Sequence, residues 1–197
     1  VTQSLYTIYI VGLNMILKIF TEDAVTVLGI YYKIQSFFFI PLLGFQQVLL
    51  PLFSYHYGAG DRHRNREILK CSMIFSVIIM AVATGTFFLF PEKLVHIFSK
   101  GSAIVAIGKT AFPVISISFV FAGLTIVITS YLQGIAHIKA SLFIIVLRQI
   151  VLLVPLAWLL HFIGLNAVWW TFPVTEIIAS VTGILIIWIL HKEDSAL

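Results

Sequence analysis

The sequence predicts an all-α, polytopic membrane protein with six transmembrane helices, and three observations indicate this fold class. Of its 197 residues, 60% are hydrophobic and only 10% are charged, whereas soluble domains are about 45–50% apolar and about 25% charged. The mean hydropathy is +1.08. The charged residues also separate apolar segments of the length, about 20 residues, that crosses a ~30 Å hydrocarbon core as a helix. Alternating segments of the kind found in membrane β-barrels do not occur in the sequence.

Six segments have this length, and they run near residues 1–19, 32–56, 69–90, 106–132, 139–161 and 166–190. Between Lys139 and His191 the only formal charges are Arg148 and Glu176. Thr21 can cap a helix whose first turn holds acidic residues, so the second segment can begin as early as Glu22. The last two segments are separated by a short turn that contains glycine and asparagine, as turns commonly do.

Composition and motifs argue against several functional classes. The net charge of +4 is modest and the basic residues lie in short loops, so no nucleic-acid partner is expected. Cys71 is the single cysteine, without zinc-type spacing around it, and is read as an apolar packing residue. The histidines form no i, i+4 pair, and no phosphate loop or nucleophile motif occurs. We therefore predict no enzyme activity, no metal site and no cofactor.

The distribution of basic residues predicts the orientation in the membrane. The strongest basic cluster is the loop at residues 61–67, closed by Lys70, and loops of this kind face the cytoplasm. Lys139, Lys192 and both ends of the segment then fall on the cytoplasmic side of a plasma (inner) membrane. The chain opens on Val1 and is apolar from the start, so we expect it to be part of a longer protein.

Five of the six prolines lie inside predicted helices. Each removes a backbone donor and can kink its helix, either harmlessly or as part of a conformational change. Pro41 and Pro51 lie on either side of Gly44, which would make the second helix bendable, as an alternating-access protein requires. We therefore take Pro41, Gly44, Pro51 and Pro173 as candidate structural or gating residues, and we add Arg148 on the fifth helix to them.

Polar side chains recur at helical spacing on the first, second and fourth helices. Unsatisfied polar groups are costly in hydrocarbon, so these faces should point into the bundle. They can serve as interhelical packing contacts or line a polar cleft. If they line a polar cleft, the candidate substrate or ion-pathway residues are Gln3, Asn14, Gln35, Gln47, Thr125 and Thr129.

Glu176 is the only acid deep inside a predicted helix, and an intramembrane carboxylate suggests a functional site. It can act as a proton carrier, a cation ligand or the partner of Arg148, or it can form a purely structural ion pair. Arg148 can instead extend towards the cytoplasmic interface.

The order of several motifs resembles the multidrug and toxic compound extrusion (MATE) family. The resemblance covers nearly the whole chain, and its quoted residues are Pro41, Gly44, Pro51 and Tyr55-His56-Tyr57-Gly58-Ala59-Gly60 before the basic loop, then Leu132-Gln133-Gly134, Lys139-Ala140-Ser141, Leu147-Arg148-Gln149, Pro155-Leu156, and Gly164 to Trp170 with Pro173 and Glu176.

The resemblance implies that this chain is the C-terminal six-helix lobe of a twelve-helix transporter. Such a protein would export drugs or other organic, often cationic, compounds in exchange for Na⁺ or H⁺, with the N-terminal lobe as its partner. Some members carry coupling acids in their seventh and tenth helices. Here the first helix offers Asn14, and the fourth offers no acid, so the key coupling carboxylate is expected in the N-terminal lobe, and Glu176 is the only local candidate.

Two other functions stay open at this stage. A lipid-linked oligosaccharide flippase of related architecture would need more cationic residues in the cleft than Arg148 and Lys33. A non-transporting membrane protein, either an anchor or an intramembrane enzyme, would not require repeated polar faces. A cavity shared by the first, second and fourth helices would favour the transporter.

Overall fold

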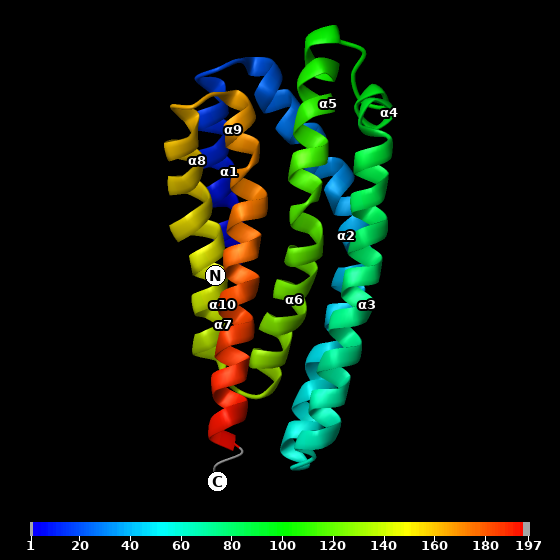
Figure 1. Cartoon of the computed structure of the whole chain (residues 1–197), viewed down its shortest axis with the longest axis vertical. Coiled ribbons are helices and arrows are strands. Elements are labelled where there is room, and N and C mark those ends of the chain that lie inside the picture. The colour runs from blue at the N-terminus through cyan, green and yellow to red at the C-terminus, as the bar shows by residue number, and fades with distance from the viewer. Residues whose placement is uncertain (1, 195–197) are drawn as a thin grey trace.

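The computed structural model describes the backbone of residues 2–194 and the side chains of residues 7–192. All elements in this part of the chain are helical, and together they form an elongated bundle (Figure 1). They are α1 (Thr2–Lys18), α2 (Glu22–Gly58), α3 (Arg62–Leu89), α4 (Pro91–His96), α5 (Ser102–Ser116), α6 (Ser118–Gly134), α7 (Ile138–Val146), the π-helical η1 (Leu147–Leu152), α8 (Leu153–His161), α9 (Leu165–Trp169) and α10 (Thr171–Asp194).

Side-chain caps make two helices start earlier than their apolar segments. The Thr21 hydroxyl accepts a hydrogen bond from the Ala24 amide at 3.1 Å, and α2 therefore begins at Glu22. The Asp61 carboxylate accepts one from the Arg64 amide at 2.9 Å, so α3 begins inside the basic loop. Pro41 and Pro51 both lie inside α2, which stays one continuous helix of 37 residues.

The segment expected over residues 106–132 is divided into α5 and α6, which are bent by 41° at Ile117. Two serine hydroxyls donate to carbonyls three residues earlier, from Ser116 to Pro113 and from Ser118 to Ile115. Such local bonds compete with the helical ladder, and Pro113 already lacks one donor. Together they account for the bend.

The segment expected over residues 139–161 contains the π-helical turn η1 between α7 and α8. Pro155 has no N–H to offer the carbonyl of Val151, and its ring crowds that carbonyl. Val151 lies within η1, so the widened turn relieves the crowding while the chain continues as a helix.

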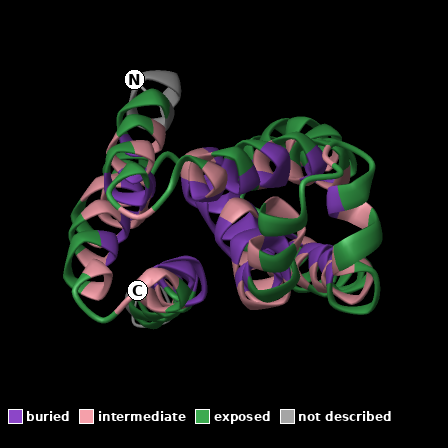
Figure 2. Ribbon diagram, turned by 90° about the horizontal axis from the view of Figure 1, so that it is seen from above, coloured by how far each residue is buried: buried purple, intermediate pink, exposed green. Residues whose placement is uncertain are grey.

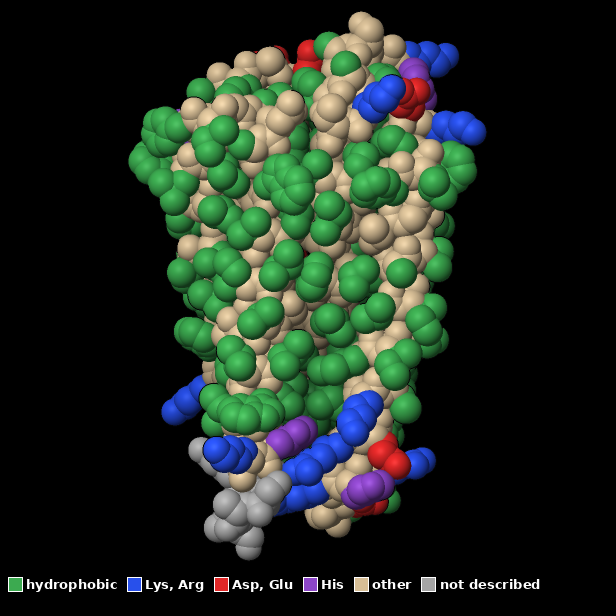
Figure 3. Space-filling view, in the orientation of Figure 1, with side chains coloured by type: hydrophobic (Ala, Val, Ile, Leu, Met, Phe, Trp, Pro, Cys, Tyr) green, Lys and Arg blue, Asp and Glu red, His purple; other side chains and the backbone are tan. Residues whose placement is uncertain are grey.

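Four helical segments are long and apolar enough to cross a membrane: residues 22–58, 62–89, 138–161 and 165–192. The bent pair α5–α6 makes a fifth if it is one span, while the searched part of α1, Thr7–Lys18, is apolar but shorter. Six spans therefore stay a prediction. Hydrophobic side chains cover the middle of the molecule, and charged ones gather at its two ends (Figure 3).

Helix α6 is the central helix of the bundle, packed against α2, α3 and α10. Seen from above, the buried residues lie on the sides of the helices that face one another, and the exposed residues lie on the outside (Figure 2). Small residues permit this close packing. A Cβ atom on Gly134 would lie 2.5 Å from Phe53 Cβ, and one on Gly123 would lie 2.5 Å from Ser76 Oγ.

Candidate functional site

A cavity of about 420 Å³ lies between α2, α6 and the α7–η1 segment, with α1 at its edge. Helix α2 contributes the Gln35 and Gln46 amides, and α6 contributes Thr125 and Thr129. The complete lining is Tyr9, Gln35, Ser36, Phe39, Ile40, Leu43, Gln46, Thr125, Ile126, Thr129, Ile145, Arg148 and Gln149. The polar faces of α2 and α6 therefore meet across one space.

A smaller cavity, of about 40 Å³, adjoins the larger one and brings in α10. The two cavities share Tyr9, Gln35, Phe39, Arg148 and Gln149. Glu176 lines only the smaller cavity. These five shared residues form the wall between the two cavities, so only one layer of side chains separates Glu176 from the larger cavity.

Arg148 and Glu176 form an ion pair between η1 and α10. Arg148 Nη1 donates to Glu176 Oε2 at 3.3 Å, and the side chains are 22% and 11% exposed. Gln149, next to Arg148 in the π-helical turn, is buried, and its Oε1 atom accepts no hydrogen bond within the described part of the chain. The turn caused by Pro155 thus presents both a cation and an acceptor to the cavities.

The threonine hydroxyls on α6 bond to their own helix. Thr125 donates to the Phe121 carbonyl at 2.9 Å, and Thr129 donates to the Thr125 carbonyl at 2.9 Å. Each hydroxyl proton is therefore used within α6 and not by a neighbouring helix. The lone pairs of each hydroxyl oxygen stay available to accept a hydrogen bond from another donor. These two hydrogen bonds are therefore not interhelical packing contacts.

Aromatic rings close the smaller cavity on the side of Tyr31. The Tyr31 ring lies 5.6 Å from Phe172 and 6.2 Å from Phe119, centre to centre, and Tyr9 meets Tyr32 edge to face at 6.4 Å. The Tyr31 cluster also includes Phe87 and Phe112, so it joins α2, α3, α5, α6 and α10.

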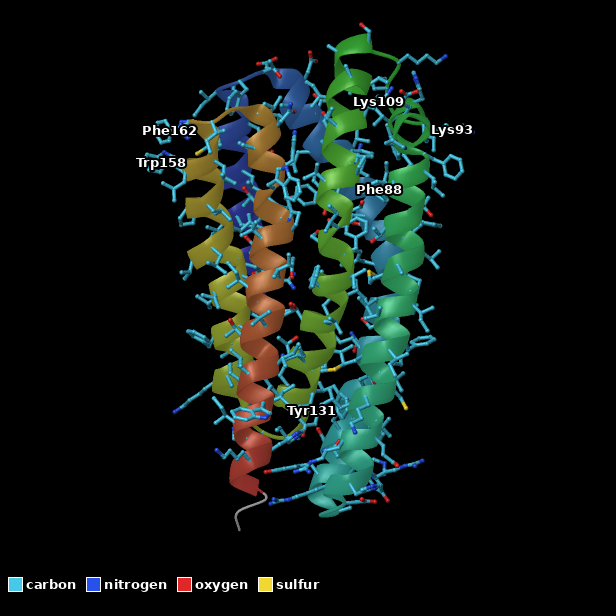
Figure 4. The ribbon with its side chains drawn as sticks, in the orientation of Figure 1. Phe88, Lys93, Lys109, Tyr131, Trp158 and Phe162 are labelled. Atoms are coloured by element: carbon cyan, nitrogen blue, oxygen red, sulfur yellow. The ribbon has the colours of Figure 1, made fainter. Side chains whose placement is uncertain are left out.

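A third cavity, of about 390 Å³, extends the polar face of α2 and α6 in the other direction. It is lined by Ser54 and Gln133 among others, and it shares Ile145 with the larger cavity. The Gln133 amide donates to Ser141 Oγ at 2.9 Å, which links α6 to α7. Tyr131, on α6 near the lower end (Figure 4), bonds to His191 at 2.8 Å.

The predicted pathway residues divide into those on the cavities and those away from them. Gln35, Thr125 and Thr129 line the larger cavity, and Glu176 lines the smaller one. Arg148, predicted as a structural or gating residue, lines both. Gln47 is exposed, and Asn14 is half-buried and lines none of these three cavities. The side chain of Gln3 lies outside the described residues.

The glycine and prolines predicted as gating residues lie on two helices. Pro41, Gly44 and Pro51 are exposed on α2, and a Cβ atom on Gly44 would meet nothing within 4 Å. Pro173 is buried in the first turn of α10. The small size of Gly44 is therefore not needed for packing within this part of the chain.

Sequence analysis missed some of the residues on the cavities. Gln46 rather than Gln47 lines the larger cavity, because consecutive helical residues point about 100° apart. Tyr9 belongs to no polar stripe, and Gln149 is exposed to the cavities through a π-helical turn. A proline six residues after Gln149 was the available signal for that turn. No group of three metal-ligating side chains occurs among the described residues.

These features define a polytopic helical membrane protein with polar cavities inside an apolar bundle. A family model described as MatE matches residues 1–159. The chain therefore belongs to the MatE family, whose members are transporters and not enzymes.

Similar proteins cover almost the whole chain. The multidrug export protein MepA of Staphylococcus saprophyticus is 25% identical over 181 residues, 92% of this chain. MepA of Staphylococcus aureus (strain NCTC 8325 / PS 47) is 22% identical over 181 residues, again 92% of this chain. The chain spans about 40% of the length of these curated relatives.

Solved structures of the family share this fold. An outward-facing multidrug resistance MATE family transporter superposes with a TM-score of 0.88 at 20% identity, covering 93% of this chain and 42% of that one. The MATE multidrug transporter DinF-BH gives a TM-score of 0.82 at 27% identity, covering 95% and 42%. The described helices thus form one lobe of such a transporter.

Proposed function

We propose that the intact protein is a secondary active transporter that exports drugs or other organic, often cationic, compounds in exchange for Na⁺ or H⁺. The observation that carries this proposal is the cavity that the polar faces of α2 and α6 share with Arg148. The names of the relatives support export of several compounds. An N-terminal lobe is the proposed partner, and the two lobes would enclose the substrate between them.

The lining of the larger cavity suits an organic molecule with a few polar groups. Apolar side chains such as Phe39, Leu43 and Ile126 would contact its carbon skeleton, while Gln35 and Gln46 would fix its polar atoms. Sites for small molecules commonly combine such apolar walls with a few polar groups.

Glu176 is the proposed local coupling residue. A proton or Na⁺ at its carboxylate would compete with Arg148, which lies 3.3 Å away, and would release the guanidinium towards the shared lining. Ion binding shifts a conformational equilibrium only if the ion prefers one state. Breaking the ion pair in one state and keeping it in the other supplies that preference.

The alternative functions have less support. A flippase for lipid-linked oligosaccharides would need several cations for a diphosphate, and Arg148 is the only cation among the described residues that line the larger cavity. Lys33 is exposed instead and lies over the Phe98 ring. An anchor protein gives no reason for amides and hydroxyls from two helices to meet in one cavity.

The test uses the intact protein reconstituted in vesicles, with ethidium as substrate and an imposed Na⁺ or H⁺ gradient. We expect export driven by one of the two gradients. Export that is indifferent to both gradients would exclude the antiporter mechanism, and absence of export with several organic cations would exclude the efflux function.

We also propose that both ends of this segment lie in the cytoplasm at a plasma (inner) membrane. Protease access to the basic loop, measured on the same vesicles, would check this orientation.

A further inference from the structure

A second large cavity lies between α2 and α3, away from the candidate site. Its volume is about 900 Å³, within the range of ligand sites. We call it the α2–α3 groove, and its lining is Phe45, Val48, Leu49, Leu52, Arg64, Glu67, Ile68, Lys70, Cys71, Ser72 and Phe75. It shares no residue with the polar cavities.

The groove is apolar along its length and charged at one end. Val48 and Phe75 are largely exposed hydrophobic residues on its walls. Arg64 lies in the first turn of α3 and Lys70 roughly 9 Å further along the helix, and Lys and Arg side chains gather at this lower end of the bundle (Figure 3). Phe45 and Phe75 meet at the other end, with ring centres 4.8 Å apart.

The groove runs along the two helices, as a lipid tail does. From Arg64 to Phe75 α3 rises through eleven residues, roughly 16 Å at the helical rise. Lys70 lies roughly 9 Å from Arg64 on this scale, which leaves an apolar part of roughly 8 Å between Lys70 and Phe75. The groove can therefore hold a headgroup and the first carbons of one acyl chain, with the Phe45–Phe75 contact at its upper end.

The charged end favours an anionic headgroup. Two cations, Arg64 and Lys70, face one acid, Glu67, and the neighbouring Arg62 and Arg66 add to the positive potential. Glu67 is held by Arg64 at 3.1 Å, on the same helix, and Lys70 supplies a second positive charge to the lining. Basic groups beside the apolar core attract anionic lipids.

We propose that the α2–α3 groove binds one anionic phospholipid, with an acyl chain between the two helices and the phosphate between Arg64 and Lys70. The groove then serves as a specific lipid site on the lower leaflet side of this lobe. Because α2 also carries Gln35 and Gln46, the lipid would contact the same helix as the transported compound.

Cys71 provides a reporter, because it is the single cysteine of the chain, is exposed, and lines the groove. The experiment uses the intact protein in detergent, with any cysteine outside this chain replaced, and follows the rate of Cys71 modification by a maleimide. Dioleoylphosphatidylglycerol and dioleoylphosphatidylcholine are added in separate arms. We expect the anionic lipid to half-protect Cys71 at a concentration roughly thirtyfold lower than the neutral one, given two basic contacts of about 1 kcal/mol each.

Three variants test the parts of the site. Arg64→Gln with Lys70→Gln should abolish the difference between the two lipids. Lys139→Gln, which removes an exposed cation outside the groove, should leave the difference unchanged. Val48→Trp should fill the groove and weaken protection by both lipids. Native mass spectrometry should find one retained phosphatidylglycerol in the parent protein and none in the double variant.

Several results would overturn the proposal. They are equal protection by the two lipids, a difference that survives in the double variant, and loss of the difference in Lys139→Gln. A phosphatidylglycerol that the double variant still retains in native mass spectrometry would overturn it as well. None of these results bears on export, so the proposed function is tested separately.

Discussion

Arg148 Nη1 lies 3.3 Å from Glu176 Oε2, and this ion pair joins η1 to α10 beside the cavities. The pair is mostly buried, and its cation is also the only one on the lining of the larger cavity among the described residues. Whatever neutralises Glu176 therefore changes the charge that the larger cavity presents. This link between an intramembrane acid and a substrate-sized space is the basis of the coupling proposal.

Glu176→Gln should leave Arg148 without its partner and lower the free energy of unfolding by on the order of 3 kcal/mol. It should also remove the dependence of export on the ion gradient. Thermal unfolding in detergent and ethidium export by vesicles measure the two effects. In the double variant Arg148→Met with Glu176→Met, stability should recover while ion-driven export does not, because apolar side chains can replace a buried ion pair in packing. Recovery of ion-driven export in the double variant would exclude Glu176 as the coupling residue.

Two consecutive glutamines on α2 provide a matched pair. Gln46 lines the larger cavity, and Gln47 is exposed. Gln46→Leu should raise the KM for an exported compound roughly ten- to a hundredfold, since a polar contact with a charged ligand is worth about 1.5–3 kcal/mol. Gln47→Leu should change it less than twofold. The reverse order would favour Gln47, with the other lobe completing a site on that face.

The helical pattern of the sequence predicts part of this site. Thr125 and Thr129 are four residues apart, so they share a face, and both line the larger cavity. The same periodicity cannot select Gln46 over Gln47, because that choice depends on how α2 is rotated in the bundle. Rotation is decided by close approaches such as Gly134 against Phe53, which are long-range contacts.

Local distortions were also beyond the sequence pattern. The bend at Ile117 divides one expected span, and η1 turns Gln149 towards the cavities. Both follow from a nearby proline, but a proline does not reveal whether its helix will bend, widen or stay continuous. Pro41 and Pro51 illustrate the third outcome, since α2 runs through both. The neighbouring helices that satisfy or crowd the freed carbonyls decide between these outcomes.

Two glycines should respond to alanine in opposite ways. A Cβ atom at Gly134 would lie 2.5 Å from Phe53 Cβ, so Gly134→Ala should force α2 and α6 apart and lower the free energy of unfolding by about 1–3 kcal/mol. Gly44 has open space around it, so Gly44→Ala should raise helix stability by about 0.5–1 kcal/mol. If bending of α2 is part of transport, Gly44→Ala should also slow export. Unchanged export in a stabilised Gly44→Ala protein would exclude a hinge at this position.

The Glu92–Lys109 ion pair, 2.6 Å long, connects the short helix α4 to α5 at the upper end of the bundle, where Lys109 is labelled in Figure 4. The hydrogen bond from Lys109, and then its charge, lower the pKa of the Glu92 carboxyl below its ordinary value of 4.5. A lowered pKa means that the pair stabilises the fold above pH 4.5 and that this contribution is lost as the pH falls through the lowered pKa.

The midpoint temperature of thermal unfolding of the parent protein should therefore be higher than that of the Glu92→Gln variant at pH 7, and the difference should shrink towards zero in acid. Because the pair is exposed, the difference should be small and should also fall at high salt. In a Lys109→Gln background, Glu92→Gln should have no further effect, and a difference that persists there would assign the stabilisation to another partner of Glu92.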